Sequence, residues 1–114
     1  MIAQLLLLTS LQTAGLVLQV QFVDPGWLQV PGITFFVQRV SSCAEPVKPI
    51  DPRRLRATTR APEGVASVPV QPDAYYRITF DGEGGFKPIN KCIHLGTSQP
   101  QEPKAYVQIQ IQLR

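Results

Sequence analysis

Short runs in which apolar and polar residues alternate are the feature that most limits what this chain can fold into. The clearest pair lies within residues 64–86, where every second side chain of two runs is apolar: Ala66, Val68 and Val70, then Tyr76, Ile78 and Phe80. A period of two places such side chains on one face of a β-strand. Residues 71–73 (QPD) between the runs have turn chemistry, so we expect a β-hairpin. The glycines of DGEGG then supply positive-φ positions before Phe86 returns the chain to the core.

Further strands are predicted at residues 16–24, 33–40, 86–95 and 105–114. Their expected inward side chains are Leu18, Val20 and Phe22; Ile33, Phe35 and Val37; Ile89, Ile93 and Leu95; and Val107, Ile109, Ile111 and Leu113. Four prolines in residues 41–62 exclude a continuous helix there and leave room for one short strand near Leu55 to Thr59. Six or seven short strands without a helix predict an all-β fold, an antiparallel β-sandwich.

Length and charge narrow the class further. A chain of 114 residues predicts one domain with a modest core. The net charge of +3 is small and is not gathered into the stripe typical of nucleic-acid binders, so we expect no nucleic-acid partner.

The first fifteen residues differ from the rest of the chain. The segment IAQLLLLTSLQTAG has the apolar run and small residues of a signal peptide cleaved after Ala14, although no lysine or arginine accompanies Met1. An ordinary apolar first strand is the second interpretation, and both stay open. Polar residues interrupt the run too early for a transmembrane span. We therefore divide the chain into a leader, residues 1–15, and a domain, residues 16–114.

Two cysteines, Cys43 and Cys92, are far apart in the sequence. In a secreted or periplasmic protein we expect them to form a disulfide, which in the chain-entropy model contributes roughly 3 to 4.5 kcal/mol.

A family resemblance follows from the order of the turns and strands: DPGWLQVPGITFFV at 24–37, EGVASVPV at 63–70, QPDAYYRITF at 71–80 and GGFKPI at 84–89. Together they resemble the carboxypeptidase regulatory-like domain, a prealbumin-like or Ig-like Greek-key sandwich, over about residues 16–114. The turn PDAYY and the long, basic residues 41–62 depart from its pattern. The resemblance implies a non-catalytic module that supports folding, spacing or contact between proteins, and it names no ligand.

Catalytic chemistry finds little support. The single histidine, His94, lies two residues from Cys92, and two ligands are too few for a structural zinc site. Asp81 and Glu83 lie in a glycine-rich turn that favours a solvated role. Among the lysines, Lys91 alternates with Ile89 and Ile93, so an isopeptide cross-link stays open for it. We predict that the chain is not an enzyme and needs no cofactor or metal.

Two groups are candidate binding residues. Trp27 in a turn and Tyr75 on the polar side of its strand are candidate exposed aromatics, which favour contact with a protein or, if they share one surface, with a carbohydrate. For Trp27, a cap over one end of the sandwich is an equal alternative. Arg53, Arg54 and Arg56, with Arg60 close by, form the densest charge and are candidates for an acidic partner. The partner expected first is a protein or a component of the cell envelope.

Overall fold

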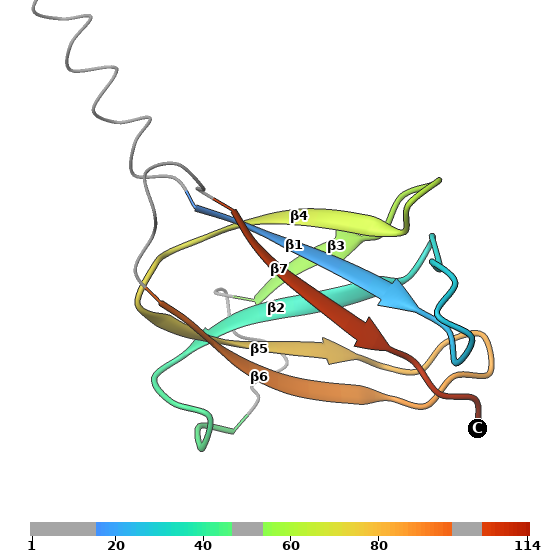
Figure 1. Cartoon of the computed structure of the whole chain (residues 1–114). Helices are drawn as coiled ribbons and strands as arrows, with labels where there is room; N and C mark the ends of the chain where they lie inside the picture. Colours follow the sequence, from blue (N-terminus) through green and yellow to red (C-terminus); the bar gives the residue numbers. More distant parts are fainter. Residues whose placement is uncertain (1–15, 47–53, 97–103) are drawn as a thin grey trace, which may run out of the picture.

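A computed structural model describes residues 16–46, 54–96 and 104–114 and shows a two-layered β-sandwich (Figure 1). The seven strands are β1 (Leu16–Val23), β2 (Thr34–Val40), β3 (Arg54–Thr58), β4 (Val65–Val70), β5 (Ala74–Phe80), β6 (Ile89–Leu95) and β7 (Lys104–Gln110). The described residues contain no helix, so the predicted all-β class is confirmed. The expected leader, residues 1–15, and Arg53 lie outside the described residues.

One layer has three strands in the order β4-β1-β7, and the other has four in the order β3-β2-β5-β6. The core lies between the layers because each strand turns its alternate apolar side chains inward. Phe22 of β1 packs against Phe35 and Phe80 of the opposite sheet, with ring centroids 5.2 and 5.9 Å away. The predicted inward residues of β1, β2, β4 and β5 are all buried.

The prediction that residues 64–86 form a β-hairpin is wrong. β4 pairs with β1 in one sheet, and β5 pairs with β2 in the other, so residues 71–73 cross between the layers. The amide of Gln71 donates to the hydroxyl of Tyr76 at 2.8 Å, and Asp73 takes a φ of 54°. Alternation predicted which side chains are buried, but it does not specify which strands are neighbours, since both arrangements bury the same faces.

The C-terminal strand also departs from expectation. β7 runs parallel to β1, within an otherwise antiparallel sandwich. It ends at Gln110, and Leu113 is 60% exposed instead of buried, because the chain beyond Ile111 bends to pair with the segment at Phe86. Val107 is half-buried at the edge of the sandwich, whereas Ile109 and Ile111 are buried as predicted.

The short strand predicted near Leu55 to Thr59 is confirmed as β3. β3 is followed by Thr59, a buried polar residue that joins the end of β3 to the connection between β1 and β2. The Thr59 hydroxyl donates to the Val30 carbonyl at 3.0 Å and accepts from the Ile33 amide at 2.9 Å. Gly64, with a φ of 65°, lies so close to the Val30 backbone that a Cβ on Gly64 would be 2.9 Å from the Val30 nitrogen. These contacts fix the connection between β1 and β2 against the end of β3.

We predict that Thr59→Val lowers the free energy of unfolding by about 1 to 3 kcal/mol, because it leaves the buried Ile33 amide and the partly buried Val30 carbonyl without their partner. Urea unfolding with the disulfide intact measures the change. Thr58→Val is the matched control, since the Thr58 hydroxyl is exposed and contacts only the Thr34 hydroxyl at 3.0 Å. Equal losses in the two variants would contradict the assigned role of Thr59.

Candidate functional site

Trp27 and Leu28 form an exposed apolar tip at one end of the sandwich, on the turn between β1 and β2. Their side chains are 62% and 66% exposed, so of the two interpretations of Trp27 the structure shows the exposed aromatic. Trp27 also has a φ of 66°, a conformation that bulky residues rarely adopt. Such a residue persists only where its surroundings fix it, so the turn itself must be held firmly.

Asp24 holds the turn. One carboxylate oxygen accepts from the amides of Gly26 at 2.8 Å and Leu28 at 3.0 Å, while the Asp24 carbonyl accepts from the Trp27 amide at 2.9 Å. From β7, the side-chain amide of Gln110 donates to the carbonyls of Asp24 and Pro25, at 3.4 and 3.2 Å. The backbone of the turn is therefore preorganised, and it carries two large apolar side chains at the surface.

Tyr75 does not join Trp27. It is half-buried and its ring stacks on His94, its cross-strand neighbour, with centroids 4.3 Å apart. Tyr75 pairs with Val40, the last residue of β2, whereas Trp27 precedes the start of β2. The two aromatics thus lie at opposite ends of the sandwich (Figure 1), and they do not form the shared platform that carbohydrate stacking requires.

The predicted disulfide between Cys43 and Cys92 is confirmed. The disulfide joins the loop after β2 to β6. Arg77 of β5 binds the same loop through hydrogen bonds. The Arg77 guanidinium donates to the carbonyls of Cys43 and Glu45 and to the Asn90 side chain, the last at 2.7 Å. One covalent bond and one arginine therefore fix residues 41–46 over the outer face of β5 and β6.

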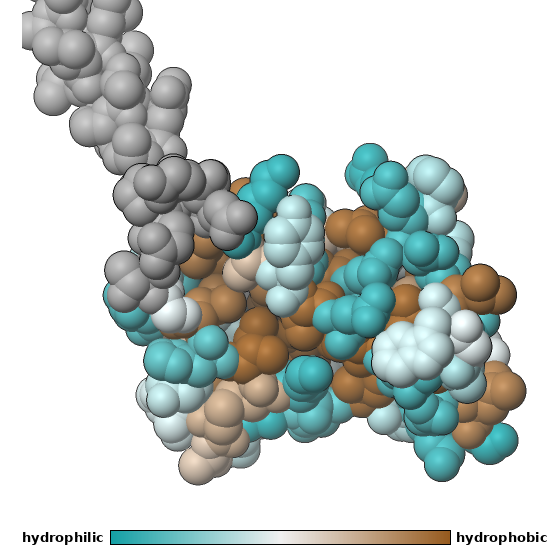
Figure 2. Space-filling view, in the orientation of Figure 1, coloured by the Kyte–Doolittle hydropathy of each residue, from teal (hydrophilic) through white to brown (hydrophobic). Residues whose placement is uncertain are grey.

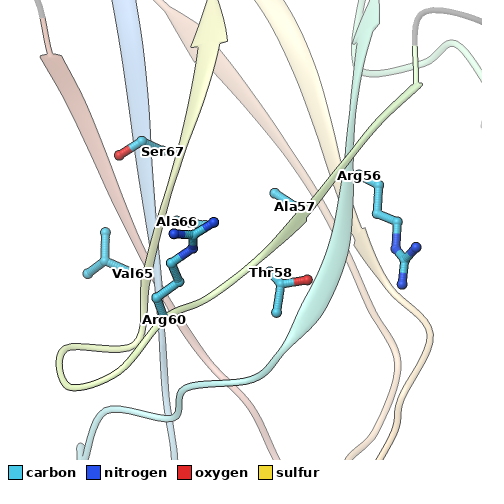
Figure 3. Close-up of a pocket in the computed structure, with 7 residues that line it drawn as sticks. All are labelled: Arg56, Ala57, Thr58, Arg60, Val65, Ala66 and Ser67. Atoms are coloured by element: carbon cyan, nitrogen blue, oxygen red, sulfur yellow. The ribbon is translucent and has the colours of Figure 1, made fainter.

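The arginine group is dispersed. Arg54 lies over the Phe36 ring, 3.5 Å from its centroid, which assigns it a cation–π contact on its own sheet. An open hollow of about 710 Å³ lies between β3 and β4 and is lined by Arg56, Ala57, Thr58, Arg60, Val65, Ala66 and Ser67 (Figure 3). Figure 3 shows the Arg60 side chain over the gap between the strands and the Arg56 guanidinium on the outer side of β3. The two cations do not converge on one point.

Groups with catalytic chemistry are equally scattered. Within residues 16–46, 54–96 and 104–114, no three His, Cys, Asp or Glu side chains stand close enough to hold a metal ion. Asp81 and Glu83 are exposed, as predicted for the glycine-rich turn. Lys87, Lys91 and Lys104 are exposed too, so none of them is the buried lysine that an isopeptide cross-link needs. No helix among the described residues is long and apolar enough to cross a membrane.

Sequence reasoning missed two parts of these sites. Leu28 is exposed to a similar fraction as Trp27, and its position directly after a D-P-G-W turn is the signal that would have found it. The role of Arg77 leaves no local signal, because its partners are 13 to 34 residues away in the chain.

Comparisons with known proteins support the fold. No family model matches the sequence. No curated protein matches it either. Solved structures do: the pilus 2b backbone protein of group B streptococcus has a TM-score of 0.64 at 11% identity, covering 85% of this chain and 40% of that one. The major pilin subunit BcpA of Bacillus cereus has a TM-score of 0.58 at 12% identity, covering 89% and 31%.

An enzyme shares the same sandwich. The 3-chlorocatechol 1,2-dioxygenase of Rhodococcus opacus has a TM-score of 0.59 at 10% identity, covering 88% of this chain and 60% of that one. This chain spans less than two thirds of each of these three proteins. At such identities the likeness concerns the β-sandwich fold alone.

We predict that removing the disulfide lowers the free energy of unfolding by about 4 kcal/mol in the chain-entropy model, since the bond closes a loop with a sequence separation of 49. Urea unfolding of the native protein, the reduced protein and the variant Cys43→Ser/Cys92→Ser measures this loss. Reducing agent should leave the double variant unchanged, which serves as the control. Identical unfolding midpoints for the native and reduced proteins would contradict the prediction.

Proposed function

We propose that this chain is an exported, non-catalytic β-sandwich module that binds another protein through the tip formed by Trp27 and Leu28. The observation that carries the proposal is the exposure of these two side chains on a turn whose backbone is fixed by Asp24. Protein interfaces gain most of their affinity from a few large apolar anchors, among which tryptophan is prominent. A turn whose backbone is already held in place loses little backbone entropy on binding, and this favours affinity.

A structural or binding role also agrees with the neighbours of the fold, two of which are a pilus backbone protein and a major pilin subunit. The dioxygenase likeness supports an enzyme less well. The sequence has one histidine, which stacks on Tyr75, and the described acidic side chains do not gather around it. The carboxypeptidase regulatory-like resemblance is part of the same proposal, supported by the turns at 24–37 and 84–89.

Carbohydrate binding is the weaker alternative. A sugar-binding face generally needs flat aromatic surface in reach of several polar side chains, and Tyr75 lies at the far end from Trp27. At the tip, the residue beside Trp27 is Leu28, a second large and exposed apolar side chain. This composition fits an apolar pocket on a protein better than a sugar ring.

Export is supported by the bond between Cys43 and Cys92, because disulfides persist mainly outside the reducing cytosol. If the signal peptide is cleaved after Ala14, the protein recovered from the cell envelope or the medium should begin at Gly15. N-terminal sequencing checks this, and titration of the unfolded protein should find no free thiol. Recovery of the chain from the cytosol with Met1 and two free thiols would contradict export.

For the tip, we predict that Trp27→Ala weakens binding to the partner at least about tenfold, as expected for an interface anchor. The immobilised protein is exposed to the solubilised envelope fraction of its organism, and retained proteins are quantified for native, Trp27→Ala and Leu113→Ala forms. Leu113→Ala is the matched control, because Leu113 is another large apolar side chain with 60% exposure. The partner sought is a protein retained by the native and control forms and lost with Trp27→Ala.

A purified partner then provides a direct measurement. Trp27 is the only tryptophan of the chain, so its fluorescence should shift to shorter wavelength when the partner buries it. A retained set that Trp27→Ala leaves unchanged would overturn the proposed tip. A fluorescence shift produced by oligosaccharides, with none produced by retained proteins, would favour carbohydrate binding instead.

A further inference from the structure

β7 is an edge strand, and the described residues place no strand beyond it in the order β4-β1-β7. The amide of Ile111 donates to the Val23 carbonyl at 2.8 Å, so this amide points toward β1. Since backbone groups alternate along a strand, the N–H and C=O groups of Tyr106, Gln108 and Gln110 point to the opposite side. The Gln112 carbonyl confirms the alternation, because it accepts from the Lys87 amide on that outer side at 2.7 Å.

The other three edges carry devices that discourage pairing with another strand. Pro69 lies within β4, Arg54 and Arg56 lie on β3, and Lys91 lies on β6. The segment AYVQIQIQL, which covers most of β7 and its continuation, has no charge, proline or glycine over nine residues. A neutral, strongly β-forming edge of this kind readily accepts a further strand.

The side of the sandwich next to β7 is also incompletely covered. Ala105 and Val107 of β7 and Ile89 and Ile93 of β6 are half-buried hydrophobic residues that line this side of the core. Figure 2 shows apolar surface between the two strands in the region that faces the viewer. On the outer face of β7, Tyr106 is 73% exposed. A strand added to the edge of β7 would cover part of the half-buried core residues on one face and part of Tyr106 on the other.

We propose that β7 pairs antiparallel with β7 of a second copy of this chain, about a twofold axis at Gln108. The register places Tyr106 opposite Gln110 on the outer face and Val107 opposite Ile109 on the inner face. About six backbone hydrogen bonds would form, two for each pair of facing residues on the edge. The result is a continuous sheet of six strands, three from each copy.

The charge pattern is the reason for choosing a second copy as the occupant. With a net charge of +3, two copies repel each other unless they meet on a neutral surface. In the twofold register every facing pair within the paired span is neutral, and on the inner face apolar side chains meet apolar ones. Lys104, the one charged residue of β7, faces Gln112, whose outer side is already taken by Lys87, so it lies beyond the paired span.

The proposal is tested by sedimentation velocity of the purified protein over a concentration series, together with hydrogen exchange of individual amides by NMR. We expect the 12.6 kDa chain to form a dimer as concentration rises, with the amides of Tyr106, Gln108 and Gln110 gaining protection in step. Gln108→Pro removes the central edge-facing N–H and should weaken the dimer at least about tenfold while leaving the backbone hydrogen bonds between β1 and β7 in place. It also removes the 3.0 Å hydrogen bond that the Gln108 side chain donates to the Gln21 side chain of β1.

A charge variant provides the second arm. Gln108→Lys brings two like charges together at the twofold axis and should weaken the dimer at least about tenfold, with partial recovery at high salt. Ser67→Lys is the matched control, since it adds the same charge to the same sheet on the exposed β4 edge, two strands away. It should dimerise as the native chain does.

Three results would overturn the proposal. A monomer at millimolar concentration would exclude self-association. A dimer that tolerates Gln108→Pro would use another surface. Protection of the edge amides that does not depend on concentration would mean that residues of the same chain occupy the edge.

Discussion

The packing of Phe22 between Phe35 and Phe80 is the interaction on which this structure depends. Phe22 comes from the three-stranded sheet and the other two rings from the four-stranded sheet, so the cluster joins the layers at their centre. All three side chains are fully buried, and removing one aromatic ring from such a core typically costs 3 to 5 kcal/mol. The Trp27 turn follows directly after β1, the strand that carries Phe22.

Alternation in the sequence predicted this core well, because burial depends only on which side of a strand a residue occupies. It predicted the strand neighbours less well. The crossing of residues 71–73 between the sheets and the parallel pairing of β7 with β1 bury the same side chains as the expected hairpin and antiparallel pairing. The prediction that Leu113 is buried is wrong for a different reason. The alternation in the sequence continues past Gln110, where the strand ends and the chain turns toward Phe86.

The candidate sites divide in the same way. The exposure of Trp27 was predictable because a D-P-G-W sequence dictates a turn, and the disulfide was predictable because only two cysteines exist. The stacking of Tyr75 on His94 and the hydrogen bonds from Arg77 to residues 41–46 were not predictable, because both depend on how distant strands are placed beside one another. Residues distant in sequence but adjacent across strands leave no local pattern.

Gln110 links the two surfaces that the structure leaves available for partners. Its side chain donates to the carbonyls of Asp24 and Pro25 and thereby supports the Trp27 turn, while its backbone groups lie on the outer edge of β7. Pairing at the edge uses the backbone and leaves the side chain free to keep its bonds to the turn. The tip and the edge are therefore compatible, and a module that pairs through β7 presents two Trp27 tips, one from each copy. Two linked tips bind a repetitive partner with an avidity that a single tip lacks.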